Sequence, residues 1–189
     1  MKNPNGAFNE DSYMGSKFLE IKNKFNLDTV IETGTYHGVT TEWFANNFDN
    51  VYTVECNETY YKEAQNRISK YSNVKSYLKD SPIFLGETLD SVKENKTIVF
   101  LDAHWYTNPV LKELEAIKNS GKKPILAIHD FKVPNRPDFG YDVYPEQGIV
   151  YDWEWIEGHI REIYGDDFQI EYNQEAEGAM RGCIFIFNK

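Results

Sequence analysis

The stretch VIETGTYHGVTTEWFA, residues 30–45, decides the fold. It begins with an apolar run that predicts a strand over Thr29–Glu32, and it ends in a pattern that predicts a helix over Val39–Phe48. Gly34 lies in the turn between them and lets the backbone turn tightly, while Gly38 permits close packing of the helix. A strand, a glycine-containing turn and a helix in this order predict the first βα unit of an α/β fold.

Outside this unit, predicted strands and helices alternate along the chain. Apolar runs predict six more strands, which are Val51–Glu55, Val74–Leu78, Thr97–Leu101, Ile125–Ile128, Phe168–Tyr172 and Cys183–Phe187. Because helical patterns separate the first five strands, we expect an α/β, Rossmann-like, doubly wound sheet of seven mainly parallel strands with helices on both faces. Only a short polar connection separates the last two strands, so we expect them to pair antiparallel.

Length and composition limit the classes of protein to consider. The 189 residues predict a single domain over residues 1–189, with an N-terminal helical segment over residues 1–27. No apolar run approaches the roughly 18 residues of a membrane helix, and no signal or transit peptide is evident, which predicts a cytoplasmic protein without a membrane partner. The formal charge of -10 disfavours nucleic acid as a partner. The sequence does not determine the oligomeric state of the protein.

Polar residues that follow the first three predicted strands are candidates for a cofactor site. Open α/β sheets bind ligands at this edge, where a carboxylate such as Glu55 can accept both hydroxyl hydrogens of a ribose. Asp80 and Ser81 offer a carboxylate and a backbone amide that can form hydrogen bonds with the N6 amine and N1 of an adenine. An ordinary turn at Gly34 and a helix cap at Asp80 are the structural alternatives. NAD is disfavoured because the turn lacks the pattern G-x-G-x-x-G.

Several segments together resemble the class I S-adenosylmethionine-dependent methyltransferases. They are VIETGTYHGVTTEWFA, VECN at residues 54–57, LKDSP at residues 78–82, FLDAHWYTNPVLKELE at residues 100–115 and ILAIHDF at residues 125–131. Within that family the chain looks most similar to the branch that includes macrocin-type O-methyltransferases and the cephalosporin hydroxylase group. The resemblance implies S-adenosylmethionine as the cofactor and an antiparallel last strand.

The resemblance also implies a set of cofactor-binding residues, which are Glu32, Thr33, Gly34, Thr35, Tyr36, Gly38, Glu55, Asp80, Ser81 and Asp102. Glu32, Gly34 and the amides near Thr35 and Tyr36 would surround the methionine portion. The ribose would be held by Glu55 and the adenine flanked by Asp80 and Ser81. Asp102 would face the sulfonium and the substrate.

Catalytic and metal-binding candidates follow the fourth and fifth strands. Metal-dependent members of the resembling branch hold a divalent cation with acids at these two strand ends, and the corresponding residues here are Asp102, His129 and Asp130. The histidine is a departure that puts Mg²⁺ in doubt, although mixed N/O ligands can still bind a metal such as Mg²⁺ or Mn²⁺. His104 and His129, the latter beside Asp130, are the candidate bases because an imidazole titrates near neutrality. A buried structural histidine is the alternative for each.

The segment over residues 131–151 shows neither helical nor strand periodicity and is rich in Pro, Gly, Asp and Tyr. A loop of this length is usually functional, so we expect a lid that shapes a pocket for a small hydroxylated acceptor, either sugar-like or natural-product-like. A surface loop without a ligand is the alternative. Two other functions are weighed against methyl transfer: a noncatalytic S-adenosylmethionine-binding protein and an NAD(P)-dependent oxidoreductase.

Overall fold

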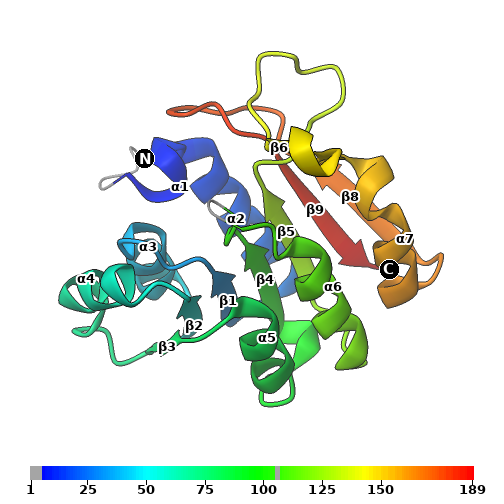
Figure 1. Ribbon diagram of the computed structural model, residues 1–189. Coiled ribbons are helices and arrows are strands. Elements are labelled where there is room, and N and C mark those ends of the chain that lie inside the picture. The colour runs from blue at the N-terminus through cyan, green and yellow to red at the C-terminus, as the bar shows by residue number, and fades with distance from the viewer. Residues whose placement is uncertain (1–5, 105–106) are drawn as a thin grey trace.

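Seven strands form one sheet in the computed structural model, which describes residues 6–104 and 107–189 (Figure 1). Their order is β3-β2-β1-β4-β5-β9-β8. The strands are β1 Thr29–Thr33, β2 Asn50–Glu55, β3 Val74–Leu78, β4 Thr97–Leu101, β5 Ile125–His129, β8 Phe168–Tyr172 and β9 Cys183–Asn188. The first five pair in parallel, whereas β9 runs antiparallel to both β5 and β8. The predicted mainly parallel sheet with its reversed last strand is therefore confirmed.

Helices cover both faces of the sheet, also as predicted. They are α1 Ala7–Glu10, α2 Ser12–Phe25, α3 Val39–Asn47, α4 Glu58–Ile68, α5 Ser81–Leu89, α6 Val110–Asn119 and α7 Trp153–Tyr164, with 3₁₀ turns η1 Glu94–Lys96 and η2 Pro145–Gln147. The core on one face includes α5, α6 and α7, and the core on the other includes α1, α2 and α3. None of the helices in the described residues is both long and apolar enough to cross a membrane.

Successive residues of the central strands pack in two separate hydrophobic cores, one on each face of the sheet. Ile31 of β1 packs in the cluster with Leu114 of α6, whereas its neighbour Val30 packs in the cluster with Phe18 of α2. Side chains alternate across a strand, so a strand that is apolar at every position is buried on both faces. Every residue of β4 and β5 is buried, and so is every residue of β1 although Thr29, Glu32 and Thr33 are polar. This two-sided burial holds the carboxyl ends of these strands in fixed positions.

The structure differs from the sequence prediction in its connecting segments. Residues 131–151 contain a short hairpin of β6 Val143–Tyr144 and β7 Ile149–Val150 that no periodicity predicts. The N-terminal segment, of which residues 1–5 lie outside the described residues, contains the unpredicted turn α1. Three of its residues, Phe8, Asn9 and Glu10, adopt positive φ angles of 54°, 56° and 69°. Two-residue strands and left-handed turns are too short or too unusual to leave a periodic pattern.

The strand order reverses between β1 and β4, which makes their carboxyl ends the switch point of the sheet. Gly34 follows β1 and lies directly against the backbone of Asp102, which follows β4. A Cβ atom on Gly34 would lie 2.5 Å from the carbonyl oxygen of Asp102, and the φ of Gly34 is +87°. Only glycine allows both the conformation and this approach. The crevice outside these strand ends is where open α/β sheets bind ligands.

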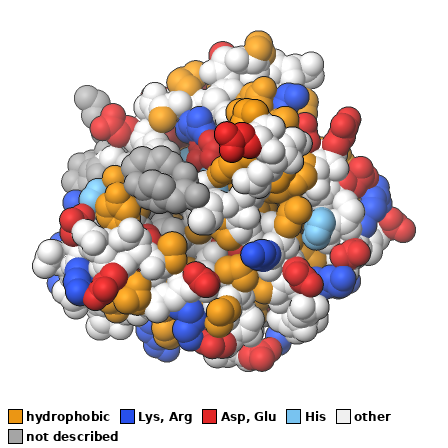
Figure 2. All heavy atoms as spheres, in the orientation of Figure 1, with side chains coloured by type: hydrophobic (Ala, Val, Ile, Leu, Met, Phe, Trp, Pro, Cys, Tyr) orange, Lys and Arg blue, Asp and Glu red, His pale blue; other side chains and the backbone are white. Residues whose placement is uncertain are grey.

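Acidic, basic and apolar side chains are mixed over the face drawn in Figure 2, among the residues shown in colour. The basic side chains on this face do not gather into one large patch. This distribution agrees with the formal charge of -10.

Candidate active site

A cavity of about 890 Å³ lies at the carboxyl ends of the parallel strands. Eight of the sequence-predicted site residues line it: Gly34, Tyr36, Glu55, Asp80, Ser81, Asp102, His104 and Asp130. It also includes residues that the sequence did not single out, among them Asn9, Asp142 and Arg181. The volume falls within the roughly 300–1,000 Å³ of typical small-molecule sites.

Glu55 ends β2 with its carboxylate fixed by two backbone amides. The amide of Tyr36 donates to Oε2 at 2.9 Å, and the amide of Asn57 donates to Oε1 at 2.8 Å. Each carboxylate oxygen keeps further acceptor capacity, because an ionised carboxylate offers about four lone-pair sites. The group is thus held in one orientation and can accept two more hydrogen bonds from a ligand diol.

Asp80 and Ser81 line the neighbouring part of the cavity at the start of α5. Asp80 occupies the N-cap position of α5, but its side chain makes no capping hydrogen bond. The structural alternative for Asp80, a side-chain cap, is therefore not what the structure shows. Pro82 and Ile83 add apolar surface to this end of the cavity, and Ile83 is 55% exposed. Apolar surface beside polar groups suits a purine ring.

Five predicted residues do not line the cavity. They are Glu32, Thr33, Thr35, Gly38 and His129. Glu32 is fully buried and accepts hydrogen bonds from the hydroxyls of Thr41 and Thr53 at 2.5 and 2.7 Å. Burial raises the pKa of Glu32 to about 8, although the two hydroxyls lower it. Glu32 therefore joins β1, β2 and α3 inside the protein instead of facing a ligand.

The backbone amides of the turn after β1 are also engaged within the protein. Gly34 and Thr35 both donate to the carbonyl of Val54, at 3.0 and 3.1 Å, and Tyr36 donates to Glu55. These amides are therefore paired within the protein, and the expectation that amides near Thr35 and Tyr36 surround a ligand stays a prediction. Gly38 instead packs α3 on α4, because a Cβ there would lie 2.9 Å from Ile68.

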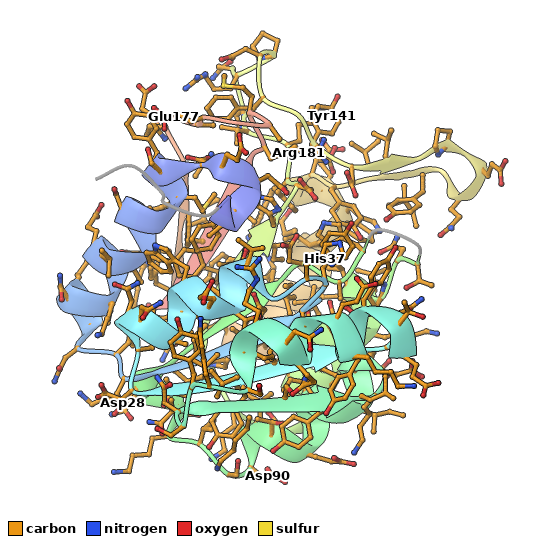
Figure 3. All side chains as sticks on the ribbon, turned by 90° about the vertical axis from the view of Figure 1, so that its left-hand side faces the viewer. Asp28, His37, Asp90, Tyr141, Glu177 and Arg181 are labelled. Atoms are coloured by element: carbon orange, nitrogen blue, oxygen red, sulfur yellow. The ribbon has the colours of Figure 1, made fainter. Side chains whose placement is uncertain are left out.

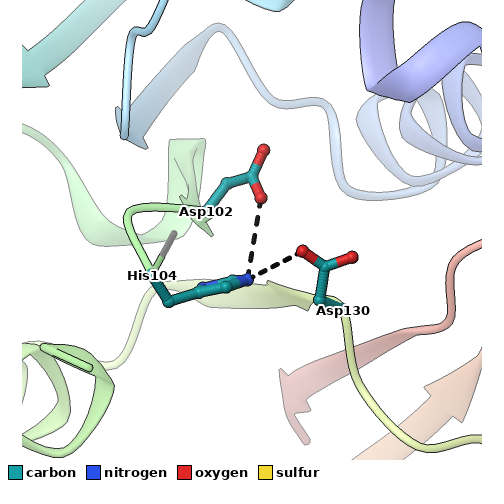
Figure 4. Close-up of side chains that lie close together, drawn as sticks. All are labelled: Asp102, His104 and Asp130. Atoms are coloured by element: carbon teal, nitrogen blue, oxygen red, sulfur yellow. Dashed lines mark hydrogen bonds and ion pairs between the residues drawn. The ribbon is translucent and has the colours of Figure 1, made fainter. Parts of the chain in front are cut away.

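Asp102, His104 and Asp130 meet at the opposite end of the cavity (Figure 4). His104 Nε2 lies 3.0 Å from Asp130 Oδ2 and 3.9 Å from Asp102 Oδ1, and 3.8 Å from Asp142 Oδ2. Burial by itself would lower the pKa of His104, but the hydrogen bond to Asp130 and the charge of Asp102 raise it overall. The three carboxylates therefore stabilise a protonated imidazole at this position.

His129 lies beneath this cluster and is 1% exposed. Its Nδ1 lies 3.0 Å from Asp102 Oδ1 and 3.4 Å from Asp130 Oδ1. Burial would lower its pKa, yet the two carboxylates outweigh burial and raise the pKa of His129 well above its ordinary value. His129 thus holds two carboxylates in place from the interior and does not line the cavity, and its role as a base stays a prediction.

Arg181 and Asp142 complete the cluster from two different loops. The Arg181 guanidinium donates through Nε to Asp130 and through Nη2 to Asp142. Figure 3 shows Arg181 near Tyr141 at one end of the molecule, with Asp28 and Asp90 at the opposite end. Burial raises the pKa of Asp142, and the adjacent Asp130 raises it further, while His104 and Arg181 lower it. In this cluster Asp130 thus lies between His104 and Arg181, and Arg181 lies between Asp130 and Asp142.

The loop over residues 131–151 reaches the cluster with three residues. The Tyr144 hydroxyl donates to the carbonyl of His104, and the ring of Tyr151 packs edge-on against the His104 ring with 5.0 Å between centroids. Asp142 lines the cavity, held by its amide, which donates to the carbonyl of Asp130 at 2.8 Å. Phe139 instead packs away from the cavity in a small separate core.

The sequence offered one indirect signal for Arg181. It lies two residues before β9, and an antiparallel strand begins at the edge where the parallel strands end. A residue just before β9 therefore lies beside residues just after β5. Asn9 carried no such signal, because its place depends on a left-handed turn and on its carbonyl, which accepts from the amide of Ala179 at 3.1 Å.

One group of ligand-type atoms is close enough for a metal ion. Among the described residues, Asp102, His104 and Asp130 offer atoms that all lie within 4.8 Å of one another. The sequence predicted His129 as the histidine ligand. In the structure the histidine of this group is His104. Both carboxylates of the group are also paired with cationic side chains, Asp102 with His129 and Asp130 with Arg181.

No protein-family model matches the chain, and no curated protein matches it by sequence. Solved structures do match. An O-methyltransferase from Bacillus cereus in complex with SAH gives a TM-score of 0.62 at 17% identity, and the match covers 94% of this chain and 81% of that chain. The O-methyltransferase TomG from Streptomyces achromogenes, involved in tomaymycin synthesis and in complex with SAM, gives 0.61 at 15% identity, covering 93% and 79%.

An N-methyltransferase, NodS from Bradyrhizobium japonicum, gives a TM-score of 0.59 at 13% identity and covers 93% of this chain and 94% of that chain. At these identities the likeness establishes the fold, which is the Rossmann-like fold that these methyltransferases share. The macrocin-type branch is not among these similar structures.

Proposed function

We propose that the protein is an S-adenosylmethionine-dependent methyltransferase that methylates a hydroxyl group of a small polar acceptor. The observation that carries this proposal is the single cavity that joins the oriented carboxylate of Glu55 to the cluster around His104. One end offers a diol acceptor site beside apolar surface, and the other offers carboxylates and an imidazole. Solved methyltransferases with the same fold, two of them in complex with SAM or SAH, support the choice of cofactor.

In this proposal the cofactor spans the cavity with its ribose on Glu55 and its adenine beside Asp80, Ser81 and Ile83. Gly34 leaves room for the cofactor chain where β1 meets β4. Asp102 then faces the sulfonium, and its negative charge favours the positively charged sulfur. The acceptor occupies the part of the cavity near Asn9, between the loops that carry Asp142 and Arg181.

The proposed reaction is an in-line displacement. The acceptor oxygen forms a bond to the methyl carbon while the C–S bond breaks, and the electron pair stays on sulfur to give the neutral thioether. The hydroxyl proton passes to Nε2 of His104 when the ring is neutral, a form that the raised pKa of His104 shifts to higher pH, and the carboxylates of Asp130, Asp102 and Asp142 stabilise the imidazolium that results. Alignment and proton removal are the two demands of this chemistry, and the cluster supplies the second.

We propose that the reaction does not require a metal, because His129 and Arg181 already pair with the carboxylates that would hold one. A divalent cation such as Mg²⁺ or Mn²⁺ at Asp102, His104 and Asp130 is the alternative, favoured by the spacing of their ligand atoms. When bound there, a cation would lower the pKa of an acceptor hydroxyl. Titration with Mg²⁺ and Mn²⁺ during the assay below decides between the two modes.

A noncatalytic S-adenosylmethionine-binding protein would need the Glu55 end of the cavity but not the cluster around His104. An NAD(P)-dependent oxidoreductase remains disfavoured by the turn after β1, where a dinucleotide fingerprint is missing. The substrate class and the cytoplasmic location stay predictions. The acceptor is proposed to be small because loops from three parts of the chain close around its end of the cavity.

Methyl transfer is tested with methyl-labelled S-adenosylmethionine and a panel of small phenols, catechols and sugars. We expect acceptor-dependent release of S-adenosylhomocysteine, and His104→Gln should reduce the rate by about 100-fold or more because it removes the proton acceptor. The affinity of His104→Gln for S-adenosylhomocysteine should stay within about twofold of wild type, since this product does not contact His104 in the proposed binding mode. Full activity of His104→Gln would contradict the assigned base, and binding without transfer to any acceptor would favour the noncatalytic alternative.

A further inference from the structure

The turn α1 holds three consecutive residues in the left-handed region of φ. Phe8, Asn9 and Glu10 have φ angles of 54°, 56° and 69°, and none of them is a glycine. The left-handed region is unfavourable for residues with a side chain, although asparagine tolerates it better than phenylalanine or glutamate. Such conformations persist only where their surroundings fix them, and they are concentrated at ligand-binding and active sites. The turn therefore needs either a structural or a functional explanation.

Contacts before and after Asn9 fix the conformation of the turn. The ring of Phe8 is 2% exposed and stacks on the ring of Phe18 with 5.2 Å between centroids. The amide of Phe8 donates to the hydroxyl of Thr40 at 3.1 Å. After the turn, the side chain of Asp11 accepts from two backbone amides at the start of α2, at 2.9 and 3.1 Å. Asn9 is thus held between two anchored residues.

Asn9 is the residue of α1 that lines the cavity. Its carbonyl accepts from the amide of Ala179, which also lines the cavity, at 3.1 Å. Gly178 allows this approach, because its φ is +61° and a Cβ atom there would overlap the carbonyl oxygen of Asn9. Figure 1 accordingly shows α1 beside the connection between β8 and β9. These contacts join the turn to the loop that carries Arg181.

A structural explanation accounts for Phe8 but not for the side chain of Asn9. Burial of the Phe8 ring needs the turn, and a glycine at position 9 would adopt a positive φ without steric cost. The asparagine adds an exposed amide group at the cavity instead. This side-chain amide forms no hydrogen bond with any residue that the structure describes. Its N–H groups are therefore available to a ligand.

Arg181, on the loop next to Asn9, uses two of its nitrogens within the protein. Its Nε donates to Asp130 and its Nη2 donates to Asp142. Ionised carboxylates only accept hydrogen bonds, so the two aspartates cannot bind a carbonyl oxygen of an acceptor. The amide of Asn9 offers two N–H groups and carries no charge. It can therefore donate to a hydroxyl or carbonyl oxygen of a neutral molecule.

We propose that Asn9 is a specificity-determining residue whose side-chain amide donates a hydrogen bond to a second oxygen of the acceptor, apart from the oxygen that is methylated. The inference rests on the proposed function. It restricts the acceptor to molecules with at least two oxygens, such as diols, hydroxy-carbonyl compounds and sugars. An analogue without the second oxygen leaves the amide unpaired and is bound less well.

The test compares the acceptor that wild type methylates fastest, from the panel of phenols, catechols and sugars, with analogues that each lack one of its other oxygens. For at least one analogue, the ratio of kcat/KM for the acceptor to kcat/KM for the analogue should fall about fivefold to tenfold in Asn9→Gly, as expected for one neutral hydrogen bond. The KM for S-adenosylmethionine should not change. Asn9→Gly should unfold at the same or a higher urea concentration than wild type, because glycine accepts a positive φ.

Asn26→Gly is the matched control, because Asn26 also has a positive φ, of 52°, and does not line the cavity. This variant should keep the wild-type ratio. Asn9→Ala removes the same amide with less backbone freedom, and it replaces Asn9→Gly if that variant does not fold. An unchanged ratio for every analogue in the folded Asn9 variant overturns the inference while the proposed function stands. If wild type transfers methyl to no member of the panel, the proposed function fails and the inference fails with it.

Discussion

Close contacts at single residues define the shape of the cavity. Gly34 has a positive φ and lies against the backbone of Asp102, so the two strand ends at the switch point approach more closely than any residue with a side chain would allow. Glu55 is held by two amides, and His104 lies among three carboxylates. Each of these side chains depends on backbone geometry that the buried strands fix.

Gly34→Ala should destabilise the protein by about 2 kcal/mol or more. The left-handed conformation alone costs an alanine roughly 1–2 kcal/mol, and the new Cβ would overlap the Asp102 carbonyl. Urea unfolding measures the loss. Gly158→Ala is the matched control, because that glycine lies in α7 with no atom within 4 Å of the new Cβ, and it should be neutral or stabilising. Equal stabilities of the two variants would show that the close approach at Gly34 does not exist.

Arg181→Met should convert the cluster into a stronger metal site. Removing the guanidinium takes one cation away from Asp130 and Asp142, and neighbouring carboxylates attract divalent ions. We expect Mn²⁺ to raise the melting temperature of Arg181→Met clearly and that of wild type little. Lys132→Met, which changes an exposed cation outside the cavity lining, is the control. Tight Mn²⁺ binding by wild type would instead support the metal-dependent alternative.

The candidate site was predicted in part from residues next to strand ends. Glu55, Asp80, Asp102 and Asp130 each follow or end a parallel strand, so their common edge could be predicted without a structure. Glu32 was misplaced, because a residue inside a strand faces one of two directions and the sequence did not show which. Asp142 and Arg181 depend on loop paths, which periodicity does not determine.

At the scale of elements, β1 and α3 carry two buried acids that respond to pH in opposite directions. Glu32 on β1 has a pKa raised to about 8 by burial. Glu42 on α3 has a pKa lowered to about 2, chiefly by its hydrogen bond to Lys70, with Arg67 and Tyr71 contributing. The first acid is neutral in the folded protein at neutral pH and the second is charged.

Glu32→Gln should change the pH dependence of stability. The folded state binds the Glu32 proton more tightly than the unfolded state, so the stabilising contribution is complete below the ordinary pKa of 4.5 and is lost as the pH rises toward about 8. The slope approaches about 1.4 kcal/mol per pH unit. Because Gln does not titrate, the stability of Glu32→Gln relative to wild type should increase with pH across this window, as measured by urea unfolding.

Glu42→Gln is the control of opposite sign. Its carboxylate contributes stability above the ordinary pKa, and this contribution is lost only as the pH falls toward about 2. Between about pH 5 and about pH 8 its difference from wild type should therefore be constant. A constant difference for Glu32→Gln as well would mean that Glu32 is ionised in the folded protein.

Most elements could be predicted because burial leaves a periodic pattern. The strands β4 and β5 are apolar at nearly every position. The helix α7 begins after Asp152, a residue type typical of helix starts, whose side chain accepts from the amide of Trp155 at 3.2 Å. The hairpin β6–β7 has two residues in each strand, which is too short for any period. The turn α1 depends on tertiary contacts, since Phe8 is buried among aromatic rings of other elements.

At the scale of the whole molecule, segments from distant parts of the sequence surround one cavity. The turn around Asn9, the loop that carries Asp142 and the loop that carries Arg181 meet at the acceptor end, while β2 and α5 form the cofactor end. The cofactor end lies on the sheet, and the acceptor end is built from loops. This division explains why the shared fold supports a cofactor proposal and leaves the acceptor to experiment.

The central claim is that the cavity binds S-adenosylmethionine with its ribose on Glu55. Calorimetry with S-adenosylhomocysteine and with NAD, on wild type and on Glu55→Gln, tests it most directly. We predict binding of S-adenosylhomocysteine to wild type, no binding of NAD, and a loss of affinity in Glu55→Gln of about 10-fold or more, corresponding to about 1.5–3 kcal/mol for hydrogen bonds to a charged group. Preference for NAD, or equal affinity of the two proteins for S-adenosylhomocysteine, would contradict the account.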